Sequence, residues 1–394
     1  MQDDADAQVP VPRGWPPGFG LGVDRPGLVV LTALRGIRPR QLHELAWREG
    51  SAARCVAAIR DGRAGSDGDR DHLGLVDPVA TQRDVEALGA RMVAPGEGDY
   101  VERFLDLPDP PAALFVRGHP LPEQPPMVAI VGARRCSNLG HEITRDLARS
   151  LAGVGYCVVS GAARGIDEAA HLGALTVDGR TVAVLGAGID HPYPRTGRRF
   201  LDRVLEARGT LLAEYPPGVE PTARHFPARN RLIAALALAV VVVEGGERSG
   251  SRITADHALD LGRDVYAVPG PITSPLSITP NGLIRDGATL ITSVDDVLEG
   301  LGVPARLAHE PPPTLEGDEL RVWEAIVEPT LPDGIARRAG LSIPATFEIV
   351  TRLELRDLVR SVGGRYERRH VPVATDDEVP DEVPDRVAEG PLAG

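Results

Sequence analysis

Six short apolar segments, separated by stretches of helical character, constrain the fold of this chain more than any other feature. They read VAIVG, CVVSG, TVAVLG, TLLAEY, LAVVVVEG and DVYAVPG, and they lie between residues 128 and 270. Strands without a polar face are buried on both sides, which is typical of a parallel sheet covered by helices. We therefore predict an α/β domain over residues 85–303, with a doubly wound, mostly parallel sheet.

The chain before this domain has a different composition. Residues 1–20 are rich in Pro and Gly and are expected to be disordered. Residues 21–75 are expected to form a small helical domain of the SAM or helix-hairpin-helix type, because the turn GIRP (36–39) resembles one whose backbone amides hold phosphates. On so short a motif a plain helical bundle is favoured. A Gly/Asp-rich linker is expected at residues 61–71.

Three segments follow the α/β domain. Residues 304–314 are expected to form a Pro-rich linker. Residues 315–372 predict three helices and then a hairpin with a Gly-Gly turn, which is the order of a winged helix. Residues 373–394 carry seven acidic residues against one Arg and are expected to form an acidic disordered tail.

Composition excludes several classes of protein. The chain has no lysine, so all 43 basic residues are Arg, and a P-loop ATPase with its Walker A lysine is excluded. The three scattered cysteines indicate a reducing compartment without disulfides or a zinc site. The N-terminus does not resemble a signal peptide, and the longest apolar run is too short to span a bilayer. We expect a cytoplasmic protein without membrane contact, cofactor or metal.

Charge is unevenly distributed along the chain. The net charge is −13, yet residues 127–235 carry 14 Arg against 10 acidic residues. Binding to a polyanion depends on the local patch and not on the total charge. This segment is therefore the candidate nucleic-acid surface, with a merely solvated surface of mixed charge as the alternative.

The first two strand-to-helix turns of the α/β domain combine glycine, serine and arginine. These residues are Gly132, Arg134 and Ser137 in the first turn, and Ser160, Gly161, Arg164 and Gly165 in the second. Arg134 and Ser137 stand where a dinucleotide-binding turn has its second and third glycines. Amides at a helix N-terminus and a guanidinium both bind anions, so the two turns predict neighbouring single-phosphate sites. A purely structural role, with arginine paired to Asp167 or Glu168, is the alternative.

Two further stretches extend this pattern. Around Phe226, an aromatic ring is interleaved with polar and basic residues, as single-stranded nucleic acid requires for stacking and phosphate contact. These residues are Arg224, Arg229, Asn230 and Arg231. A second Gly/Ser turn, Ser249-Gly250-Ser251, resembles a phosphate-binding loop. Core packing of Phe226, and ion pairs of Arg248 and Arg252 with nearby acids, are the alternatives.

The chain resembles the DprA/Smf family of bacterial DNA-processing proteins in seven motifs and in their order. The motifs are VAIVGARRCSNLG, VVSGAARGIDEAAHLGAL, VLGAGIDHPYP, HFPARNRLIAAL, ERSGSRITADHAL, GRDVYAVPGPI and NGLIRDGATLI. The resemblance implies an extended Rossmann fold that binds single-stranded DNA and catalyses no reaction. It also implies a homodimer that loads the RecA recombinase onto the strand and displaces single-strand-binding protein.

By motif position, the resemblance assigns phosphate contacts to the residues of the first two turns and base stacking to Phe226. The family often has Tyr where Leu139 stands, Asn where Gly197 stands, and Lys at several DNA-contacting places. Arg195, Arg198 and Arg199 are the candidates that replace this lysine charge, and Arg195 is included among the expected DNA contacts.

Two other functions were weighed against DNA-strand binding. A nucleotide-processing enzyme related to the phosphoribohydrolases would need a glutamate near a P-G-G-x-G-T turn, and the comparable segment EGGERSGSRIT lacks that motif. A duplex-binding winged helix would need basic residues at the start of its recognition helix, which here reads SIPATFEIV. We therefore expect a protein-contact role for that domain.

Overall fold

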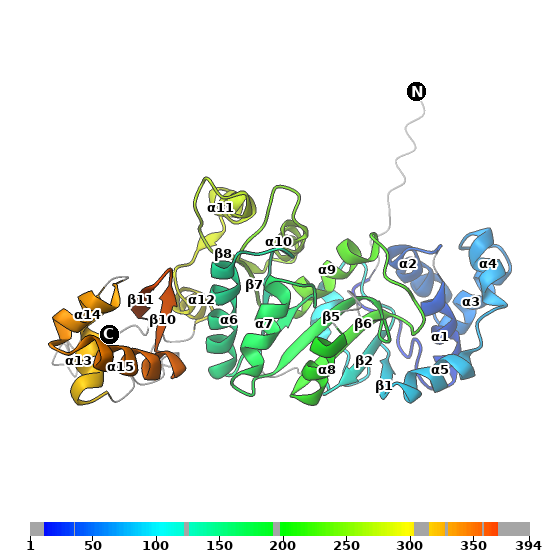
Figure 1. Cartoon of the computed structure of the whole chain (residues 1–394). Coiled ribbons are helices and arrows are strands. Elements are labelled where there is room, and N and C mark those ends of the chain that lie inside the picture. Colours follow the sequence, from blue (N-terminus) through cyan, green and yellow to red (C-terminus); the bar gives the residue numbers. More distant parts are fainter. Residues whose placement is uncertain are drawn as a thin grey trace, which may run out of the picture. The chain divides into compact units, whose positions relative to one another are not determined.

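The computed structural model describes residues 12–34, 36–121, 126–191, 198–302, 315–327, 330–356 and 358–368. The chain divides into two compact units, Met1–Ala308 and His309–Gly394. Figure 1 shows the elements of both units. The first unit holds the sheet and the candidate site, and the second is a small helical unit with a hairpin.

A single mixed sheet organises the first unit. Within the described residues it has nine strands in the order β1-β2-β6-β5-β4-β3-β7-β8-β9. The run from β6 to β9 is parallel, whereas β1 and β2 pair antiparallel at one edge. The strands are β1 (Ala90–Val93), β2 (Leu114–Gly118), β3 (Met127–Val131), β4 (Cys157–Ser160), β5 (Thr181–Gly188), β6 (Gly209–Tyr215), β7 (Ala239–Val242), β8 (Asp264–Ala267) and β9 (Thr289–Leu290).

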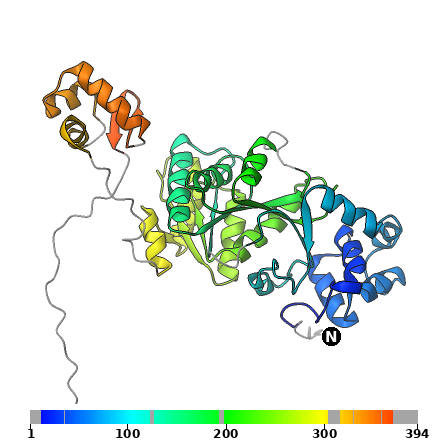
Figure 2. The same ribbon diagram turned by 90° about the horizontal axis from the view of Figure 1, so that it is seen from below.

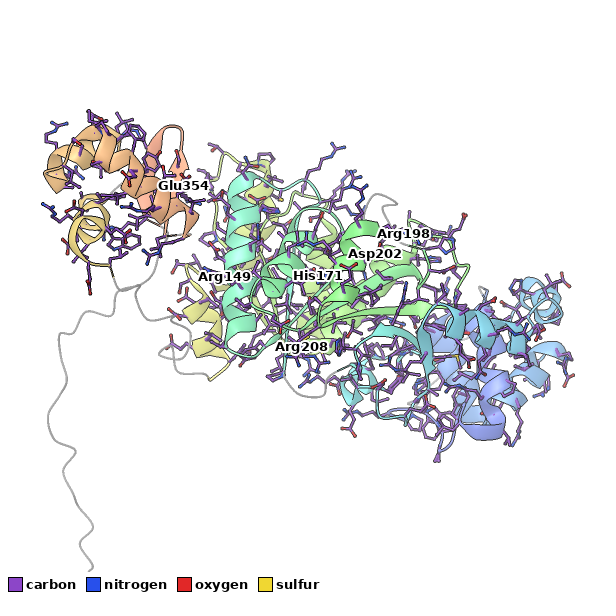
Figure 3. The ribbon with its side chains drawn as sticks, turned by 60° about the horizontal axis from the view of Figure 1, so that its bottom comes forward. Arg149, His171, Arg198, Asp202, Arg208 and Glu354 are labelled. Atoms are coloured by element: carbon purple, nitrogen blue, oxygen red, sulfur yellow. The ribbon has the colours of Figure 1, made fainter. Side chains whose placement is uncertain are left out.

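Helices cover both faces of this sheet, as Figure 2 shows from below. Three of them, α6 (Asn138–Gly153), α7 (Ile166–Leu175) and α8 (Arg198–Glu206), lie side by side on one face. Figure 3 marks Arg149 on α6, His171 on α7 and Asp202 on α8. The other face carries α9 (His225–Leu236) and α10 (Gly250–Asp260); α11 (Ile278–Arg285) and α12 (Val294–Gly300) follow β8 and β9.

The period of a β-strand explains why the apolar segments have no polar side. In β3, Met127, Ala129 and Val131 pack with Leu232 and Ile233 of α9. The alternate residues Val128 and Ile130 pack with α6 and α7 on the opposite face. Since both faces are buried, every position of the strand is apolar. The expected doubly wound, extended Rossmann-like sheet is confirmed.

The order of the strands places a switch point between β3 and β7. From β3 the chain moves through β4 and β5 to β6 on one side, and then α9 returns it to β7 on the other side of β3. Ligands of such sheets bind at the carboxyl ends of the strands beside the switch point. The turns after β3 and β7 are therefore the expected position of a ligand-binding site.

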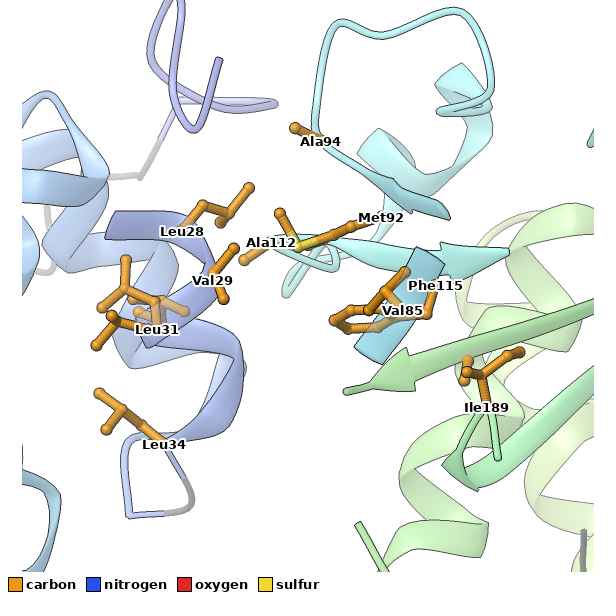
Figure 4. Close-up of a cluster of buried hydrophobic side chains, with 14 of the residues drawn as sticks. Leu28, Val29, Leu31, Leu34, Val85, Met92, Ala94, Ala112, Phe115 and Ile189 are labelled. Atoms are coloured by element: carbon orange, nitrogen blue, oxygen red, sulfur yellow. The ribbon is translucent and has the colours of Figure 1, made fainter. Parts of the chain in front are cut away.

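The N-terminal helices share a core with the sheet. They are α1 (Arg25–Ala33), α2 (Pro39–Glu49), α3 (Ala52–Arg60), α4 (Asp67–Leu73) and α5 (Pro78–Ala87). Leu28 and Val29 of α1 belong to the same buried cluster as Met92 of β1 and Phe115 of β2. Figure 4 shows these side chains between α1 and the strands. The helices are thus joined to the α/β unit by a continuous apolar core.

Two expectations for this N-terminal region are wrong. Residues 12–20 pack on the helices although residues 1–20 were expected to be disordered: Trp15 stacks on Phe19 at 4.8 Å between ring centroids, and Phe19 is buried. The expected linker at 61–71 contains the start of α4, because Ser66 caps this helix and accepts from the amide of Asp69. Residues 1–11 lie outside the described residues.

The GIRP turn does not offer its amides to a phosphate. The Asp69 carboxylate accepts a hydrogen bond of 2.8 Å from the amide of Gly36. In addition, α1 packs closely on α3: a Cβ at Gly27 would lie 2.7 Å from the backbone nitrogen of Ala53. The favoured reading, a plain helical bundle, fits this region better than a helix-hairpin-helix.

The second unit is a winged helix, as expected. Its elements are α13 (Gly317–Ala325), α14 (Pro332–Ala339), α15 (Ile343–Leu355), β10 (Val359–Val362) and β11 (Arg365–Arg368). Val322, Ile335, Val350 and Leu353 form a small core between the three helices. Thr330 adds a bridge to the hairpin through its paired backbone bonds with Tyr366.

Candidate nucleic-acid interface

A cleft of about 800 Å³ opens at the switch point of the sheet. We call it the switch cleft. It is formed by the turn after β3, the start of α9 and the turn between β7 and α10. Among its lining residues are Gly132, Arg134, Arg135, Phe226, Arg229, Asn230, Arg248, Ser249, Gly250 and Ser251. Eight residues expected from the sequence to contact DNA thus meet in one cleft, although three separate chain segments supply them.

The first two turns are neighbours, as the pairing of β3 with β4 predicted. The amide of Ile166 donates to the carbonyl of Ala133 at 3.2 Å. Gly165 makes this approach possible, because its φ is +81° and a Cβ would lie 2.4 Å from that same carbonyl oxygen. Arg164, beside it, is exposed.

The α6 N-terminus after the first turn already holds an anion of the protein itself. Ser137 caps α6, and its hydroxyl accepts from the amide of Gly140 at 2.9 Å. The carboxylate of Glu244, directly after β7, accepts from the Ser137 amide at 2.8 Å and from its hydroxyl at 2.6 Å. In this structure an internal carboxylate occupies the position of the phosphate expected at Ser137, and the phosphate contact stays a prediction.

The second turn is largely buried. Ser160 has no exposed surface, and its hydroxyl donates to the carbonyl of Ile130 at 2.6 Å. The carbonyl of Gly161 accepts from Arg229 at 2.6 Å. The Ser160 hydroxyl and the Gly161 carbonyl are thus bonded within the protein, and a phosphate contact at either residue stays a prediction. These two bonds hold the turn in place.

Arg229 and Asp167 form a buried pair below the cleft. Arg229 is 5% exposed and also donates to the carbonyl of Val184 in the middle of β5. Burial lowers the pKa of Arg229 to about 10, against the attraction of Asp167. Burial likewise raises the pKa of Asp167, although Arg229 opposes this shift. Arg229 lines the cleft but mainly ties α9 to two strands, so we assign it a positioning role.

Arg231 was expected to contact DNA, and this expectation is wrong. It is 5% exposed and forms ion pairs with Glu214 at 2.7 Å and Asp109 at 3.1 Å. Burial alone would lower the pKa of Arg231, but Glu214 and Asp109 raise it. Because Asp109 and Glu214 neutralise the Arg231 guanidinium inside the protein, Arg231 has a structural role.

The turn before α10 is held by short side-chain contacts. Ser249 caps the helix, and its hydroxyl lies 2.8 Å from that of the buried Ser251. The side-chain amide of Asn230 donates to the carbonyl of Gly250 at 3.1 Å. Asn230 and Ser251 therefore shape this side of the cleft, while Gly250 is exposed.

Phe226 lies in the cleft, half-buried, with a guanidinium over its ring. The central carbon of Arg134 is 4.9 Å from the ring centroid. The other side of the ring packs against the β5 strand, where a Cβ at Gly186 would lie 2.9 Å from it. A cation above an aromatic face is stabilised by the ring quadrupole. Charge and a flat apolar surface thus meet at one place.

Three arginines give the cleft its positive charge. Arg134, Arg135 and Arg248 line it and are exposed, and none of them has an ion pair with a described acid. By contrast, Arg252 pairs with Asp256 at 2.9 Å and Asp286 at 3.0 Å, so the expected alternative is confirmed for Arg252. Arg224 is exposed at the start of α9. Arg195 lies outside the described residues.

Sequence reasoning missed Arg135 and Glu244. Arg135 is exposed, as many surface arginines are, and the sequence alone does not show that it lines the cleft beside Arg134. Glu244 follows β7, which is distant from α6 in sequence. Its role becomes visible only when the strand order places β7 beside β3.

The described parts of the chain contain neither a metal-binding cluster nor a membrane-spanning helix. No group of three or more His, Cys, Asp or Glu residues there is arranged to hold a metal ion. No helix among these residues is both long enough and apolar enough to cross a membrane.

Two family models match the chain. Residues 91–302 match the model of DNA recombination-mediator protein A, and residues 306–365 match the DprA winged helix domain. The first match contains every strand from β2 to β9 and the whole switch cleft. The second contains most of the second unit.

Individual relatives agree with these matches. Protein Smf of Escherichia coli (strain K12) is 38% identical over 279 residues, which are 68% of this chain and 75% of that protein. A putative DNA processing protein DprA of Mycobacterium tuberculosis (strain H37Rv) is 44% identical over 250 residues, 61% of this chain and 64% of that protein. The X-ray structure of DNA processing protein A from Streptococcus pneumoniae aligns with a TM-score of 0.61 at 32% identity, covering 69% of this chain and 95% of that one.

Proposed function

The chain belongs to the DNA recombination-mediator protein A family, also named DprA/Smf, and from this membership we propose that it binds single-stranded DNA in the switch cleft. The observation that carries the proposal is one cleft lined by the ring of Phe226 and by three exposed arginines, Arg134, Arg135 and Arg248, that form no ion pair with a described acid. Arginines follow the phosphates of a strand, while an aromatic ring accepts a stacked base.

The chemistry of the cleft favours a strand over a duplex. Stacking needs an unpaired base, and each stacked base contributes about 1–3 kcal/mol. Phosphate contacts carry no sequence information, so we expect little sequence preference. The proposed contacts are Gly132, Arg134, Arg135, Phe226, Arg248, Ser249 and Gly250, with Arg164 and Arg224 at the rim.

The remaining residues of the expected site act behind this surface. Gly165 brings the first two turns together, and Arg229 connects α9 to the turn after β4 and to the middle of β5. Ser160, Asn230, Arg231 and Ser251 are buried. A substitution at these positions is expected to act through the shape of the cleft.

We propose that strand binding serves recombination without catalysing a reaction. In this proposal the protein protects the strand, loads a RecA-type recombinase onto it and displaces single-strand-binding protein. A homodimer would hold two switch clefts. The edge of the sheet at β9 supports this assembly, because Leu290 on this edge strand is half exposed.

The proposal is tested by the affinities for a strand and a duplex of the same length and sequence, measured by filter binding in one buffer. We expect tighter binding to the single strand, with an affinity that falls steeply as salt rises. Equal or tighter binding to the duplex would contradict the proposal. Recombinase filament growth on a strand coated with single-strand-binding protein, with and without this chain, tests the loading step.

A further inference from the structure

The N-terminus of α6 is the position at which a doubly wound sheet normally binds the phosphate of a nucleotide. This helix follows the first strand beside the switch point, and its free amides and dipole favour an anion. Here the anion is Glu244. Its two carboxylate oxygens accept from the amide and the hydroxyl of Ser137, at 2.8 and 2.6 Å.

A second feature shows that the helix is shaped around this carboxylate. Gly140 lies in the first turn of α6, and a Cβ there would be 2.4 Å from the carboxyl carbon of Glu244. No real Cβ makes so short a contact, so any larger residue would displace the carboxylate. Gly140 therefore provides the space that Glu244 occupies, and Ser137 provides the hydrogen bonds.

We infer that Glu244 is a specificity-determining residue: its carboxylate takes the place of a nucleotide phosphate at the α6 N-terminus and excludes pyrophosphate and free nucleotides from these amides. This inference rests on the proposed function, because it explains why the cleft takes the phosphates of a strand. A pyrophosphate at the same amides would have to displace the carboxylate or lie beside a like charge. The phosphates of a strand are left to the exposed arginines that line the switch cleft, such as Arg134, Arg135 and Arg248.

Removal of the carboxylate should therefore create a phosphate site. We expect Glu244→Ala to bind inorganic pyrophosphate at least about tenfold more tightly than the unchanged protein, since the amide and hydroxyl of Ser137 become available. Adenosine diphosphate forms a second arm, which shows whether the opened site also accepts a nucleoside. Isothermal titration measures both ligands. Glu244→Gln, of the same size, should show a smaller gain because its amide still fills the space.

Glu247 offers a matched control, because it is an exposed acid only three residues from Glu244 and it lines the switch cleft. Glu247→Gln removes one negative charge without opening the α6 N-terminus. If the gain in pyrophosphate affinity came from net charge alone, Glu247→Gln and Glu244→Gln would gain equally, and the inference would be overturned. A gain confined to the Glu244 variants supports it.

A second measurement tests the geometry without any ligand. Gly140→Ala should destabilise the unchanged protein, because the new Cβ pushes the carboxylate away from Ser137. In a Glu244→Ala background the same substitution should be neutral or stabilising, since alanine favours a helix over glycine. An equal loss in both backgrounds would show that Gly140 does not make room for Glu244.

The two proposals fail separately. If the unchanged protein does not bind single-stranded DNA, the proposed function is wrong, while the pyrophosphate gain of Glu244→Ala still reports on the α6 site. If the strand binds and Glu244→Ala gains no affinity for pyrophosphate, the inference on Glu244 is wrong and the proposed function stands.

Discussion

Arginines around the switch cleft have two different roles, and burial separates them. Arg134, Arg135 and Arg248 are exposed and have no ion pairs with described acids. Arg229 and Arg231 are buried, and both bind groups of the protein itself. Substitutions in the first group should change DNA affinity, whereas those in the second group should change stability.

Arg134 and Phe226 allow charge and stacking to be measured separately. Arg134→Ala should weaken binding to every sequence alike and lower the slope of log affinity against log salt by about 0.7–1, because fewer counterions are released. Phe226→Ala should weaken binding by about 1–3 kcal/mol with almost no change in slope. Salt titrations of both variants, beside thermal melts, make the comparison. A Phe226→Ala protein that melts far below the unchanged protein yet binds the strand normally would refute the stacking role.

Arg231 should matter for folding alone. Arg231→Ala leaves Asp109 and Glu214 without their buried partner, so it should lower the free energy of unfolding by about 3–5 kcal/mol in a urea titration. Arg224→Ala, near the start of the same helix but exposed, is the control and should change it by less than about 0.5 kcal/mol. An Arg231→Ala protein of normal stability with a reduced salt slope would restore Arg231 to the DNA surface.

Residue identities alone could not separate these roles. The motif around Phe226 correctly predicted that arginines, an asparagine and an aromatic ring meet at the start of α9. It did not show that the helix turns Arg229 and Arg231 inward, because their partners Gly161 and Glu214 come from distant strands. The bond between Ser137 and Glu244 could not be predicted for the same reason, since Glu244 follows β7 and is 107 residues away in sequence.

At the scale of elements, the apolar segments predicted β3 to β8, while β1, β2 and β9 were missed. β1 and β9 are short, and β2 pairs antiparallel at the edge, where neither glycine turns nor a following helix mark it. Helix α4 was missed because its Gly and Asp residues are typical of a linker. Its capping box, Ser66 with Asp69, was the signal that could have identified it.

Asp69 is the residue on which α4 and the GIRP turn both depend. Burial alone would raise the pKa of Asp69, but hydrogen bonds from Ser66 and Gly36 lower it below its ordinary value of 3.8. The carboxylate therefore stabilises the fold above pH 3.8, and this contribution is lost as the pH falls through the lowered pKa.

Asp69→Ala should accordingly lower the free energy of unfolding at pH 7 by about 1–2 kcal/mol. The difference in the free energy of unfolding between Asp69→Ala and the unchanged protein should shrink as the pH falls below 3.8, the ordinary pKa of an aspartate. Urea titrations at several pH values measure it. Asp67→Ala in the same helix is the control. Asp67 is exposed, and its one ion pair within the described residues is with Arg70. A loss for Asp69→Ala that is independent of pH would contradict this account.

At the scale of the whole molecule, the sheet has two unlike edges. The β1 edge continues into the N-terminal helices, and the β9 edge exposes Leu290. If the β9 edge forms the proposed homodimer, Leu290→Arg should shift the mass in light scattering from dimer towards monomer at micromolar concentration. Val79→Arg, on α5 near the β1 edge, places the same charge on an exposed apolar residue and should leave the mass unchanged. A monomer for the unchanged protein would dismiss the dimer.

The central claim is that the phosphates of a single strand bind in the switch cleft, and paired double variants test it most directly. Arg134→Ala with Arg248→Ala removes two charges from the cleft. Arg149→Ala with Arg208→Ala removes two charges elsewhere: Arg208 precedes β6, and Arg149 lies in the second half of α6, so both are near the amino ends of the strands (Figure 3).

Fluorescence anisotropy of a labelled oligothymidine strand is measured across a salt series. The cleft pair should lower the salt slope by about 1.4–2 and the other pair by almost nothing. Equal slopes for the two pairs would show that the strand binds elsewhere.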